Sequence, residues 1–115
     1  MPDLLFVYGT LRSHFDNDWA RKLRDSGVHL GKASVPGSIY RVGHFPVYRS
    51  EPSGTVHGEL YEVPDSLFTV LDDYEGEAFN RIPITLHDGR EAWIYAYDSE
   101  PGDAPRIESG DFTRE

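Results

Sequence analysis

The sequence predicts an α+β domain with a curled β-sheet. Short apolar segments bounded by Gly, Pro and Asp-Gly turn signals amount to about five to six strands. Only two segments have the residue spacing of short amphipathic helices. Strands and helices do not alternate regularly along the chain, which disfavours a doubly wound parallel sheet.

The N-terminal region predicts one strand and one helix. Leu4 to Tyr8 is a continuous apolar segment closed by Gly9, a pattern that is typical of a strand buried on both faces. After a loop, Asp18 or the residue before it can cap a short peripheral helix that passes through Leu23. Gly27 is placed to end that helix in a left-handed conformation.

The centre of the chain predicts further strands and a second helix. Residues 38–63 combine apolar residues with Gly and Pro in a pattern that fits at least two strands. Asp65 then caps the best-defined helix of the sequence, because apolar residues follow it at helical spacing. Gly76 is expected to end this helix.

The C-terminal third predicts a hairpin. Residues 82–86 and 92–97 flank a turn in which Asp88 and Gly89 supply positive backbone angles, so the two strands should pair antiparallel. After a loop, residues 107–112 are expected to return to the body of the domain. The sequence contains no internal repeat and no linker that would divide it, so we expect residues 1–115 to form a single domain.

The composition favours a small-molecule partner over a polyanionic one. With 38% hydrophobic and 13% aromatic residues, a chain of 115 residues can build its own core. Eleven Lys and Arg against twenty Asp and Glu give a net charge of −9, which repels nucleic acids and anionic membrane surfaces. This acidic, lysine-poor balance fits either a salt-adapted source or a biased genome.

Several chemistries have no support in the sequence. The absence of cysteine excludes disulfides, Cys-ligated zinc and a thiol nucleophile. The histidines do not fall within metal-ligand spacing of one another, and neither a nucleotide-binding fingerprint nor a Gly-x-Ser-x-Gly elbow occurs. The N-terminus has no signal-peptide pattern and no segment is long enough to cross a membrane, so we expect a soluble cytoplasmic protein without metal or cofactor.

Glu75 is the first candidate for chemistry, because the predicted helix places its carboxylate in the last turn. The helix dipole opposes ionisation there by about 0.3–1 kcal/mol, and the like charge of Asp72 adds about a few tenths of a kcal/mol if both groups face water. Only burial would raise the pKa of Glu75 to the neutral range that a general base needs. The alternative interpretation is a solvated, acidic helix end.

The second candidate is the loop Tyr8-Gly9-Thr10-Leu11, where a buried strand breaks into backbone N–H groups that have no strand partner. Such loops bind anions; Gly9 permits a ligand to approach closely, and Thr10 adds a hydroxyl. An ordinary turn at the end of a strand fits the same residues.

Arg81 and Tyr97 are weaker candidates at the ends of the predicted hairpin. Either side chain could face the carboxylate or hydroxyl of a substrate. A surface charge and a core tyrosine are the alternative interpretations.

Taken together, these motifs match a known family in order and spacing. Its motifs in this chain are Val7-Tyr8-Gly9-Thr10-Leu11-Arg12, Gly58-Glu59-Leu60-Tyr61-Glu62-Val63, Leu71-Asp72-x-x-Glu75-Gly76, Phe79-x-Arg81, Ala92-Trp93-Ile94-Tyr95 and Ile107-x-Ser109-Gly110-Asp111-Phe112. On these motifs the chain resembles the gamma-glutamylcyclotransferase-like proteins over nearly its whole length. Phe79 stands where many members carry Tyr.

The resemblance implies a mixed curled sheet or small barrel with two short helices packed outside it. It also implies a cofactor-free pocket where the loop 8–11 meets Glu75, which would act as general acid and base. The substrate would be a gamma-glutamyl amine, amino acid or peptide that cyclises to 5-oxoproline and releases the amine, while the backbone N–H groups of Gly9, Thr10 and Leu11 hold a carboxylate or oxyanion. The alternative from another class is a non-catalytic domain that retains the pocket and binds a small metabolite.

Overall fold

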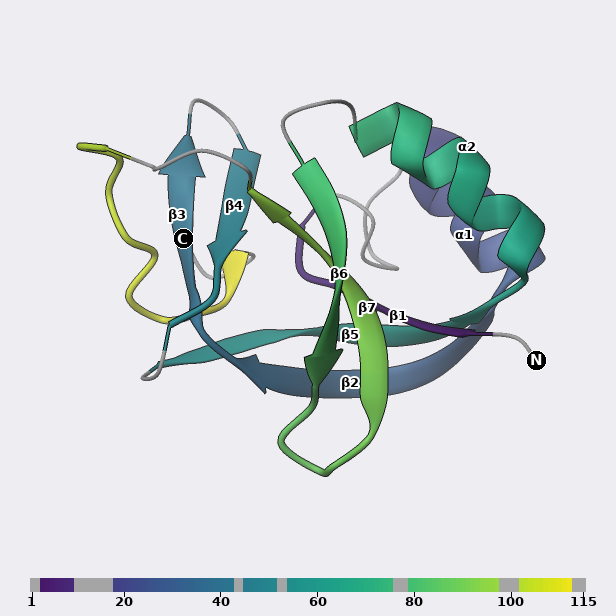
Figure 1. The fold of residues 1–115 in the computed structure, drawn as a ribbon, viewed down its shortest axis with the longest axis horizontal. Helices are drawn as coiled ribbons and strands as arrows, with labels where there is room; N and C mark the ends of the chain where they lie inside the picture. Colours follow the sequence, from purple (N-terminus) through teal and green to yellow (C-terminus); the bar gives the residue numbers. More distant parts are fainter. Residues whose placement is uncertain are drawn as a thin grey trace.

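The computed structural model describes residues 3–9, 18–42, 45–51, 54–75, 79–97 and 102–112. The α+β class predicted from the sequence is confirmed. The strands are β1 (Asp3–Val7), β2 (Val28–Pro36), β3 (Ser38–Val42), β4 (Phe45–Arg49), β5 (Thr55–Val63), β6 (Phe79–Thr85) and β7 (Glu91–Tyr97), and the helices are α1 (Asp18–Ser26) and α2 (Asp65–Glu75). Figure 1 shows both helices together on one side of the sheet.

The seven described strands form one mixed sheet in the order β2-β5-β1-β7-β4-β3, with β6 added on β7. The pair β1 and β7 and the pair β4 and β7 are parallel, whereas β1 with β5, β2 with β5, β3 with β4 and β6 with β7 are antiparallel. Strand β7 therefore joins two blocks of the sheet and also carries the β6 hairpin.

The sheet curls because its two outermost strands in this order, β2 and β3, are consecutive in the chain. Only Gly37 separates them, and its φ of 132° lies in a region that favours glycine. A Cβ at this position would lie 2.6 Å from the Tyr48 ring, so glycine also permits close packing. The bend transfers the chain from pairing with β5 to pairing with β4.

Two hydrophobic cores lie on the two faces of the curled sheet. One fills the inside of the curl and includes Phe6 and Tyr8 of β1, and the other lies under the helices and includes Leu5 and Val7 of the same strand. The prediction that this strand is buried on both faces is thus confirmed. The helices contribute Leu23, Leu67, Phe68 and Leu71 to the second core.

Three details of the predicted elements are corrected by the structure. Strand β2 was not predicted, because only Val35 of its nine residues is a buried hydrophobic and no alternation marks it. Gly27 does not adopt a positive φ. It is required instead by close packing, since a Cβ there would lie 2.9 Å from the Glu62 carbonyl oxygen. In the hairpin turn, only Gly89 has a positive φ, 94°, and Asp88 does not.

The C-terminal segment returns to the body, as predicted. The Ile107 amide donates to the Ile39 carbonyl over 2.9 Å, and the His57 amide donates to the Gly110 carbonyl over 2.8 Å. Ile107 is buried inside the curl. This segment therefore covers the side of the curled sheet that lies away from the helices (Figure 1).

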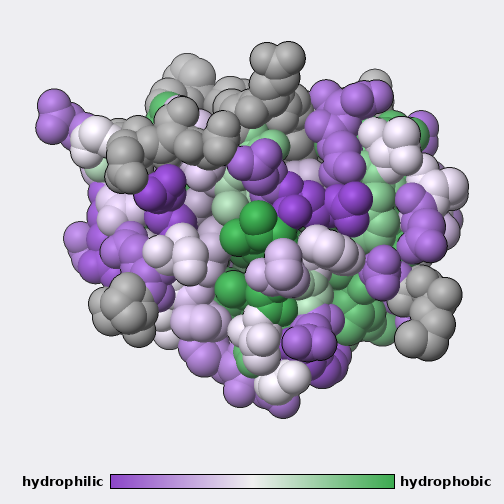
Figure 2. Space-filling view, in the orientation of Figure 1, coloured by the Kyte–Doolittle hydropathy of each residue, from purple (hydrophilic) through white to green (hydrophobic). Residues whose placement is uncertain are grey.

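The surface seen in Figure 2 is hydrophilic over most of its area, with a small hydrophobic area near its centre, where β6 lies in Figure 1. Val28 and Leu30 are the large hydrophobic side chains that are exposed among the described residues. Neither α1 nor α2 has the length and hydrophobicity that crossing a bilayer requires, and the described part of the chain has no other helix.

Candidate functional site

The candidate site lies at the end of the sheet where four chain segments meet. Because β1 runs parallel to β7, their C-terminal ends point the same way, and the antiparallel β6 begins there with Phe79 paired to Tyr97. Helix α2 ends at Glu75, and the connection to Phe79 can extend over no more than about 14 Å. The end of β1, the start of β6, the end of β7 and the end of α2 are thus held together by topology.

Tyr8 lies where β1 leaves β7 and β4 takes its place. Its hydroxyl donates to the Tyr95 carbonyl over 2.7 Å and accepts from the Tyr48 amide over 3.1 Å. The side chain is 7% exposed and belongs to the core inside the curl. One hydroxyl therefore links three strands at the point where the loop begins.

Gly9 begins the loop predicted to bind substrate, and the structure gives a packing reason for glycine there. Its φ lies outside the left-handed region, but a Cβ would lie 2.9 Å from Cγ of Pro46. Thr10 and Leu11, which the prediction also named, lie outside the described residues.

Glu75 is the last residue of α2, as the sequence predicted, while its side chain is outside the described set. Its position follows Phe68 and Leu71 by seven and four residues, and both of those side chains are buried under the helix. Residues at such spacing share one face of a helix. Position 75 therefore continues the face by which α2 packs on the sheet.

Asp72 ties the last turn of α2 to the hairpin. Its Oδ1 accepts hydrogen bonds from Arg81 Nε over 3.0 Å and from the Tyr95 hydroxyl over 2.7 Å, and its Oδ2 accepts from Arg81 Nη2 over 3.3 Å. We call these three residues the Asp72 cluster. Since Arg81 belongs to β6 and Tyr95 to β7, one carboxylate joins three elements.

Aromatic rings contact the guanidinium group of Arg81, in addition to the Asp72 carboxylate. The guanidinium carbon lies 4.3 Å from the centre of the Phe68 ring and 4.8 Å from that of Trp93, distances typical of cation–π contacts. Its side chain is 26% exposed. The repulsion expected between Asp72 and Glu75 applied to two carboxylates that both face water. The structure instead pairs Asp72 with a cation, which offsets its charge.

A cavity of about 310 Å³ opens beside this cluster and is lined by Asp72, Phe79, Asn80, Arg81 and Tyr95. Its walls carry a carboxylate, a guanidinium, an amide and a phenol hydroxyl. Position 75 follows Asp72 by one turn, about 4.5 Å along the axis of α2. The cavity therefore lies next to the residue predicted to carry the chemistry.

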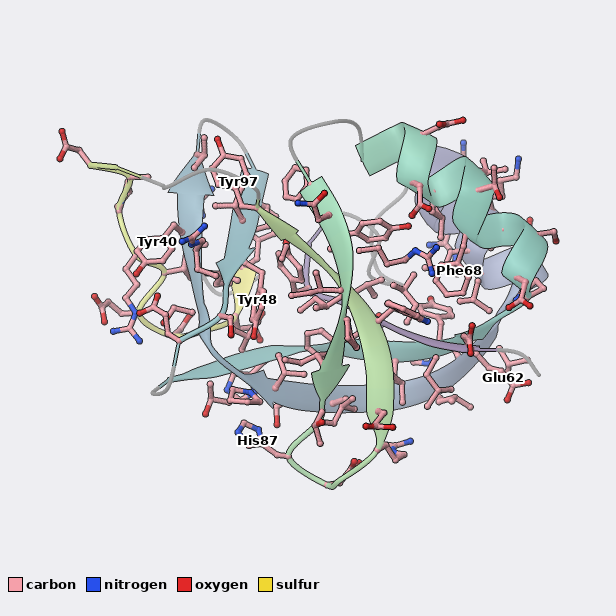
Figure 3. The ribbon with its side chains drawn as sticks, in the orientation of Figure 1. Tyr40, Tyr48, Glu62, Phe68, His87 and Tyr97 are labelled. Atoms are coloured by element: carbon pink, nitrogen blue, oxygen red, sulfur yellow. The ribbon has the colours of Figure 1, made fainter. Side chains whose placement is uncertain are left out.

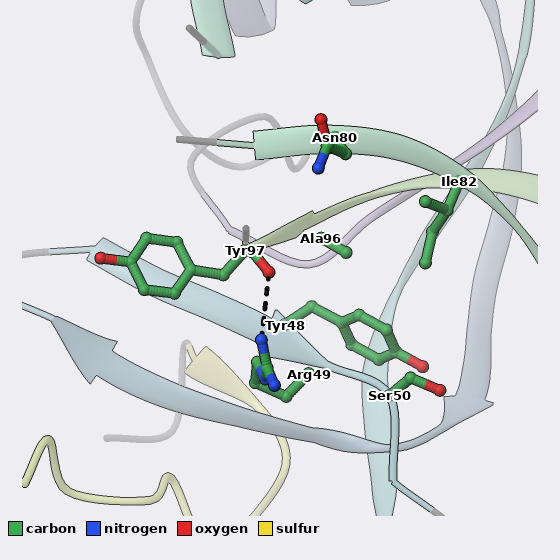
Figure 4. Close-up of a pocket in the computed structure, with 7 residues that line it drawn as sticks. All are labelled: Tyr48, Arg49, Ser50, Asn80, Ile82, Ala96 and Tyr97. Atoms are coloured by element: carbon green, nitrogen blue, oxygen red, sulfur yellow. Dashed lines mark hydrogen bonds between the residues drawn. The ribbon is translucent and has the colours of Figure 1, made fainter. Parts of the chain in front are cut away.

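Tyr97 lies on the other side of β6 from Phe68 (Figure 3). Its ring packs on Phe79, with the ring centres 5.6 Å apart, and its carbonyl accepts from Arg49 Nη1 over 3.4 Å. A second cavity, of about 330 Å³, is lined by the C-terminal part of β4 with Ser50, and by residues of β6 and β7 (Figure 4). Asn80 lines both cavities.

Two further buried polar groups lie away from this end of α2. Glu59 of β5 is 5% exposed, and one of its oxygens lies 3.5 Å from His29 Nε2. The Tyr61 hydroxyl is buried without a hydrogen-bond partner among the described residues, and burial raises the pKa of this phenol. Burial likewise raises the pKa of Tyr48, whose hydroxyl donates to the Pro36 carbonyl over 2.6 Å.

Sequence reasoning did not anticipate the roles of Tyr95, Asn80 and Arg49 at this end of the sheet. Tyr95 is buried in β7 next to the buried Ile94, and the sequence marks it only as part of the motif Ala92-Trp93-Ile94-Tyr95. Asn80 is the second residue of β6 and Arg49 is the last residue of β4, and neither belongs to a local motif. The pairing of β6 with β7, which places Asn80 opposite Ala96, was the signal that could have drawn attention to them.

Comparison with known proteins relates nearly the whole chain to one family. The family model described as gamma-glutamyl cyclotransferase, AIG2-like, matches residues 5–114. The Escherichia coli K12 protein described as gamma-glutamylcyclotransferase family protein YtfP is 34% identical over 113 residues, which cover 94% of each chain.

Solved structures share the fold. An uncharacterized protein from Pyrococcus horikoshii has a TM-score of 0.80 and 26% identity, covering 97% of this chain and 91% of the other. The solution structure of E. coli YtfP has a TM-score of 0.71 and 31% identity, covering 94% of each chain. An AIG2-like protein from Mus musculus, at 20% identity and a TM-score of 0.78, covers 93% of this chain and 86% of its own, and shows likeness of fold alone.

Proposed function

Because the chain belongs to the AIG2-like gamma-glutamyl cyclotransferase family, we propose that it cyclises a gamma-glutamyl compound to 5-oxoproline and releases an amine, an amino acid or a peptide. Glu75 is the general acid and base of this proposal. The loop that begins with Tyr8 and Gly9 holds the substrate, and Arg81 and Tyr97 flank it.

The observation that carries the proposal is the placement of position 75. Helix α2 ends there, one turn beyond the Asp72 cluster, on the face that packs against the sheet. The short connection to Phe79 keeps this position near the end of β7, where the loop after β1 also begins. A carboxylate at this place has a cavity with polar walls beside it.

The chemistry needs one group that accepts and then donates a proton. The α-amino nitrogen of the substrate attacks the γ-carbonyl carbon, a C–N bond forms to close the lactam ring, and the bond from that carbon to the departing nitrogen breaks. Glu75 takes the proton that the attacking nitrogen loses and delivers it to the departing nitrogen. Backbone N–H groups of the loop stabilise the oxyanion that develops between the two steps.

Intramolecular attack explains why few groups suffice. The nucleophile and the carbonyl belong to one molecule, so a pocket that folds the substrate into a ring-like pose supplies much of the acceleration. The protein then contributes positioning, proton transfer and oxyanion stabilisation. These are the roles that the proposal assigns to the loop and to Glu75.

The test is the release of 5-oxoproline from a panel of gamma-glutamyl amines, amino acids and peptides. Glu75→Gln keeps the shape of the side chain but cannot accept the proton, and we expect it to lower the rate by about 10²–10⁴-fold. Asp73→Asn is the matched control, because Asp73 is an exposed carboxylate on the same turn of α2, and it should keep the wild-type rate.

Equal rates for wild type and Glu75→Gln would remove Glu75 from the chemistry. Absence of turnover across the whole panel, together with binding of 5-oxoproline in a calorimetric titration, would establish the non-catalytic binding domain instead. Circular dichroism of each variant confirms that a lost rate does not reflect a lost fold.

A further inference from the structure

Tyr95 bonds to both sides of the candidate active site. Its carbonyl accepts a hydrogen bond from the Tyr8 hydroxyl over 2.7 Å, and its own hydroxyl donates to Asp72 Oδ1 over 2.7 Å. Tyr8 is the residue at which the loop after β1 begins, and Asp72 lies in the last turn of α2, which ends at Glu75. A single residue of β7 therefore connects the start of the loop with the end of the helix.

The two bonds start from opposite faces of the curled sheet. Side chains alternate between the faces along a strand, so Ile94 packs inside the curl and Tyr95 packs under the helices. Tyr8 belongs to the core inside the curl and reaches the backbone of β7 from there. Asp72 meets the Tyr95 hydroxyl on the helix side. The contacts from Tyr8 through Tyr95 to Asp72 thus pass across the sheet.

Packing leaves the Tyr95 side chain little freedom to move. The side chain is 4% exposed, and it belongs to the same core as Phe68 and Leu71 of α2. In the register of the hairpin it lies opposite Arg81, which donates to the same carboxylate. A donor that is fixed in this way restricts where the carboxylate can lie, because a hydrogen bond weakens steeply away from its preferred geometry.

Arg81 and Tyr95 contribute differently to the position of Asp72. Arg81 supplies the opposite charge and bonds to both oxygens, but the Asp72 side chain is 42% exposed, so water can replace part of this pairing. The Tyr95 hydroxyl donates from the buried side, and a bond from a hydroxyl to a carboxylate is among the stronger ones in proteins. Loss of this hydroxyl therefore leaves the charge of Asp72 compensated but its position less well defined.

Tyr95 also lines the cavity of about 310 Å³ beside position 75. Its hydroxyl proton is donated to Asp72 and is not available to a bound substrate. Asp72 precedes position 75 by less than one helical turn, so a displacement of one moves the other. The effect of Tyr95 on a reaction in this cavity therefore passes through Asp72 and the last turn of α2.

We propose that Tyr95 is a positioning residue, which fixes Asp72 and so holds position 75 at a defined distance from the loop that begins at Tyr8. This inference rests on the proposed cyclisation, which needs Glu75 and the loop to act on one substrate. A misplacement of about 1 Å can lower a rate by about 100-fold when the reacting groups must meet in a defined geometry. The Tyr95 hydroxyl thus affects the rate of the chemical step more than the affinity for the substrate.

The turnover test uses Tyr95→Phe, which keeps the ring and removes the hydroxyl. With the gamma-glutamyl substrate that the wild type converts best, this variant should lower kcat by about tenfold and leave KM within about twofold. Combined with Asp72→Ala, it should cause no further loss beyond that of Asp72→Ala alone, because both residues act through one contact. Tyr61→Phe is the matched control and should keep the wild-type kcat, since it removes a buried hydroxyl of the same core that has no hydrogen-bond partner among the described residues.

Amide hydrogen exchange tests the positioning without any substrate. Tyr95→Phe should speed exchange over residues 72–75 by about five- to tenfold, whereas Tyr61→Phe should leave these amides unchanged. The amide of Leu60, in a strand that is paired on both sides, reports opening of the whole sheet and shows whether the change is local. If Tyr95→Phe does not fold, Asp72→Ala breaks the same contact from the helix side and should give the same local increase.

Three results would overturn the positioning role in turnover: an unchanged kcat in Tyr95→Phe, a loss confined to KM, or additive losses in the double variant. Equal exchange over residues 72–75 in Tyr95→Phe and Tyr61→Phe would overturn the structural basis of that role. If the wild type converts no gamma-glutamyl substrate, the proposed cyclisation is refuted, and the exchange measurement alone decides whether Tyr95 fixes the end of α2.

Discussion

At the scale of single residues, two buried tyrosines show how the same hydroxyl group has different consequences in different places. The Tyr8 hydroxyl is bonded to backbone groups of β7 and β4, whereas the Tyr61 hydroxyl has no partner among the described residues. A buried polar group without a hydrogen bond lowers the stability of the folded protein. The Tyr8 hydroxyl provides a hydrogen-bond partner for one backbone carbonyl and one backbone amide.

The pair therefore predicts opposite effects of one chemical change. Tyr8→Phe leaves the Tyr95 carbonyl and the Tyr48 amide without this partner, and should lower the free energy of unfolding by about 1–3 kcal/mol. Tyr61→Phe removes a buried hydroxyl that makes no described bond, and should leave stability unchanged or raise it by up to about 1 kcal/mol. Urea unfolding midpoints of the two variants measure the difference. A similar loss in both would show that the hydroxyls are equivalent.

Some features of the candidate site could be predicted from the sequence and others could not. Glu75 could be placed at the end of a helix because capping and apolar spacing are local signals. The partners of Asp72 could not be foreseen, because Arg81 is nine and Tyr95 twenty-three residues away and the pairing of β6 with β7 brings them together. Tertiary contacts of this kind leave no local pattern.

At the scale of elements, the Asp72 cluster fastens the last turn of α2. The helix is eleven residues long and ends in a turn with three acidic side chains, which its own dipole does not favour. Its two buried leucines and Phe68 pack on the core, and the carboxylate of Asp72 adds a polar tie to both strands of the hairpin. This tie positions the last turn of the helix, which ends at Glu75.

Removal of the tie should loosen that turn selectively. Asp72→Asn cannot pair with Arg81 as an anion, so we expect faster amide hydrogen exchange over residues 71–75 and a loss of about 1 kcal/mol of stability, since the pair is partly exposed. Asp73→Asn is the control, because it also removes a negative charge near the C-terminus of α2 and gains the same dipole relief. Equal exchange in the two variants would contradict the fastening role.

The sequence predicted the helices and strands whose buried residues recur at regular spacing. It did not predict the strand without such spacing. Helix α2 and the β6–β7 hairpin have apolar spacing and turn residues that identify them. Strand β2 lies at the edge of the strand order and is largely exposed, so its residues had no need to alternate. Backbone pairing with β5, which a sequence pattern does not report, makes it a strand.

At the scale of the whole molecule, the curled sheet is completed by a C-terminal segment that fits closely against β5. Gly110 has a φ of 70°, and a Cβ there would overlap the Thr55 carbonyl oxygen. Gly102 has a similar φ of 61°, but no atom of the described residues lies within 4 Å of the place that a Cβ would take. A side chain would be strained by the positive φ at both positions, but it would clash with a described neighbour at Gly110 alone. Comparing the two positions therefore distinguishes the effect of the backbone angle from that of packing.

Their alanine variants should differ accordingly. Gly102→Ala pays only the strain of a left-handed residue, about 1–2 kcal/mol, whereas Gly110→Ala adds overlap with β5 of about 1–3 kcal/mol more. Thermal unfolding by calorimetry gives both values, with the larger drop in melting temperature expected for Gly110→Ala. Equal drops would mean that the C-terminal segment can move away from β5 at no cost.

The overall class could be predicted because the number and order of elements limit the possible architectures. The lack of regular alternation of strand and helix disfavours a doubly wound sheet, and short strands with frequent glycines favour a curled one. The closure itself depends on a bend at Gly37 and on parallel pairs that join distant segments. Neither feature has a signature within a window of neighbouring residues.

The central place of β7 has a consequence for the order of events during folding. Strand β1 pairs on one side, at Leu5, with Trp93, which lies far later in the chain. The block of β1, β2 and β5 and the β3–β4 hairpin can each pair earlier, but they have no common edge until β7 joins them. With contacts this distant in sequence, we expect folding on the slow scale of about milliseconds to seconds.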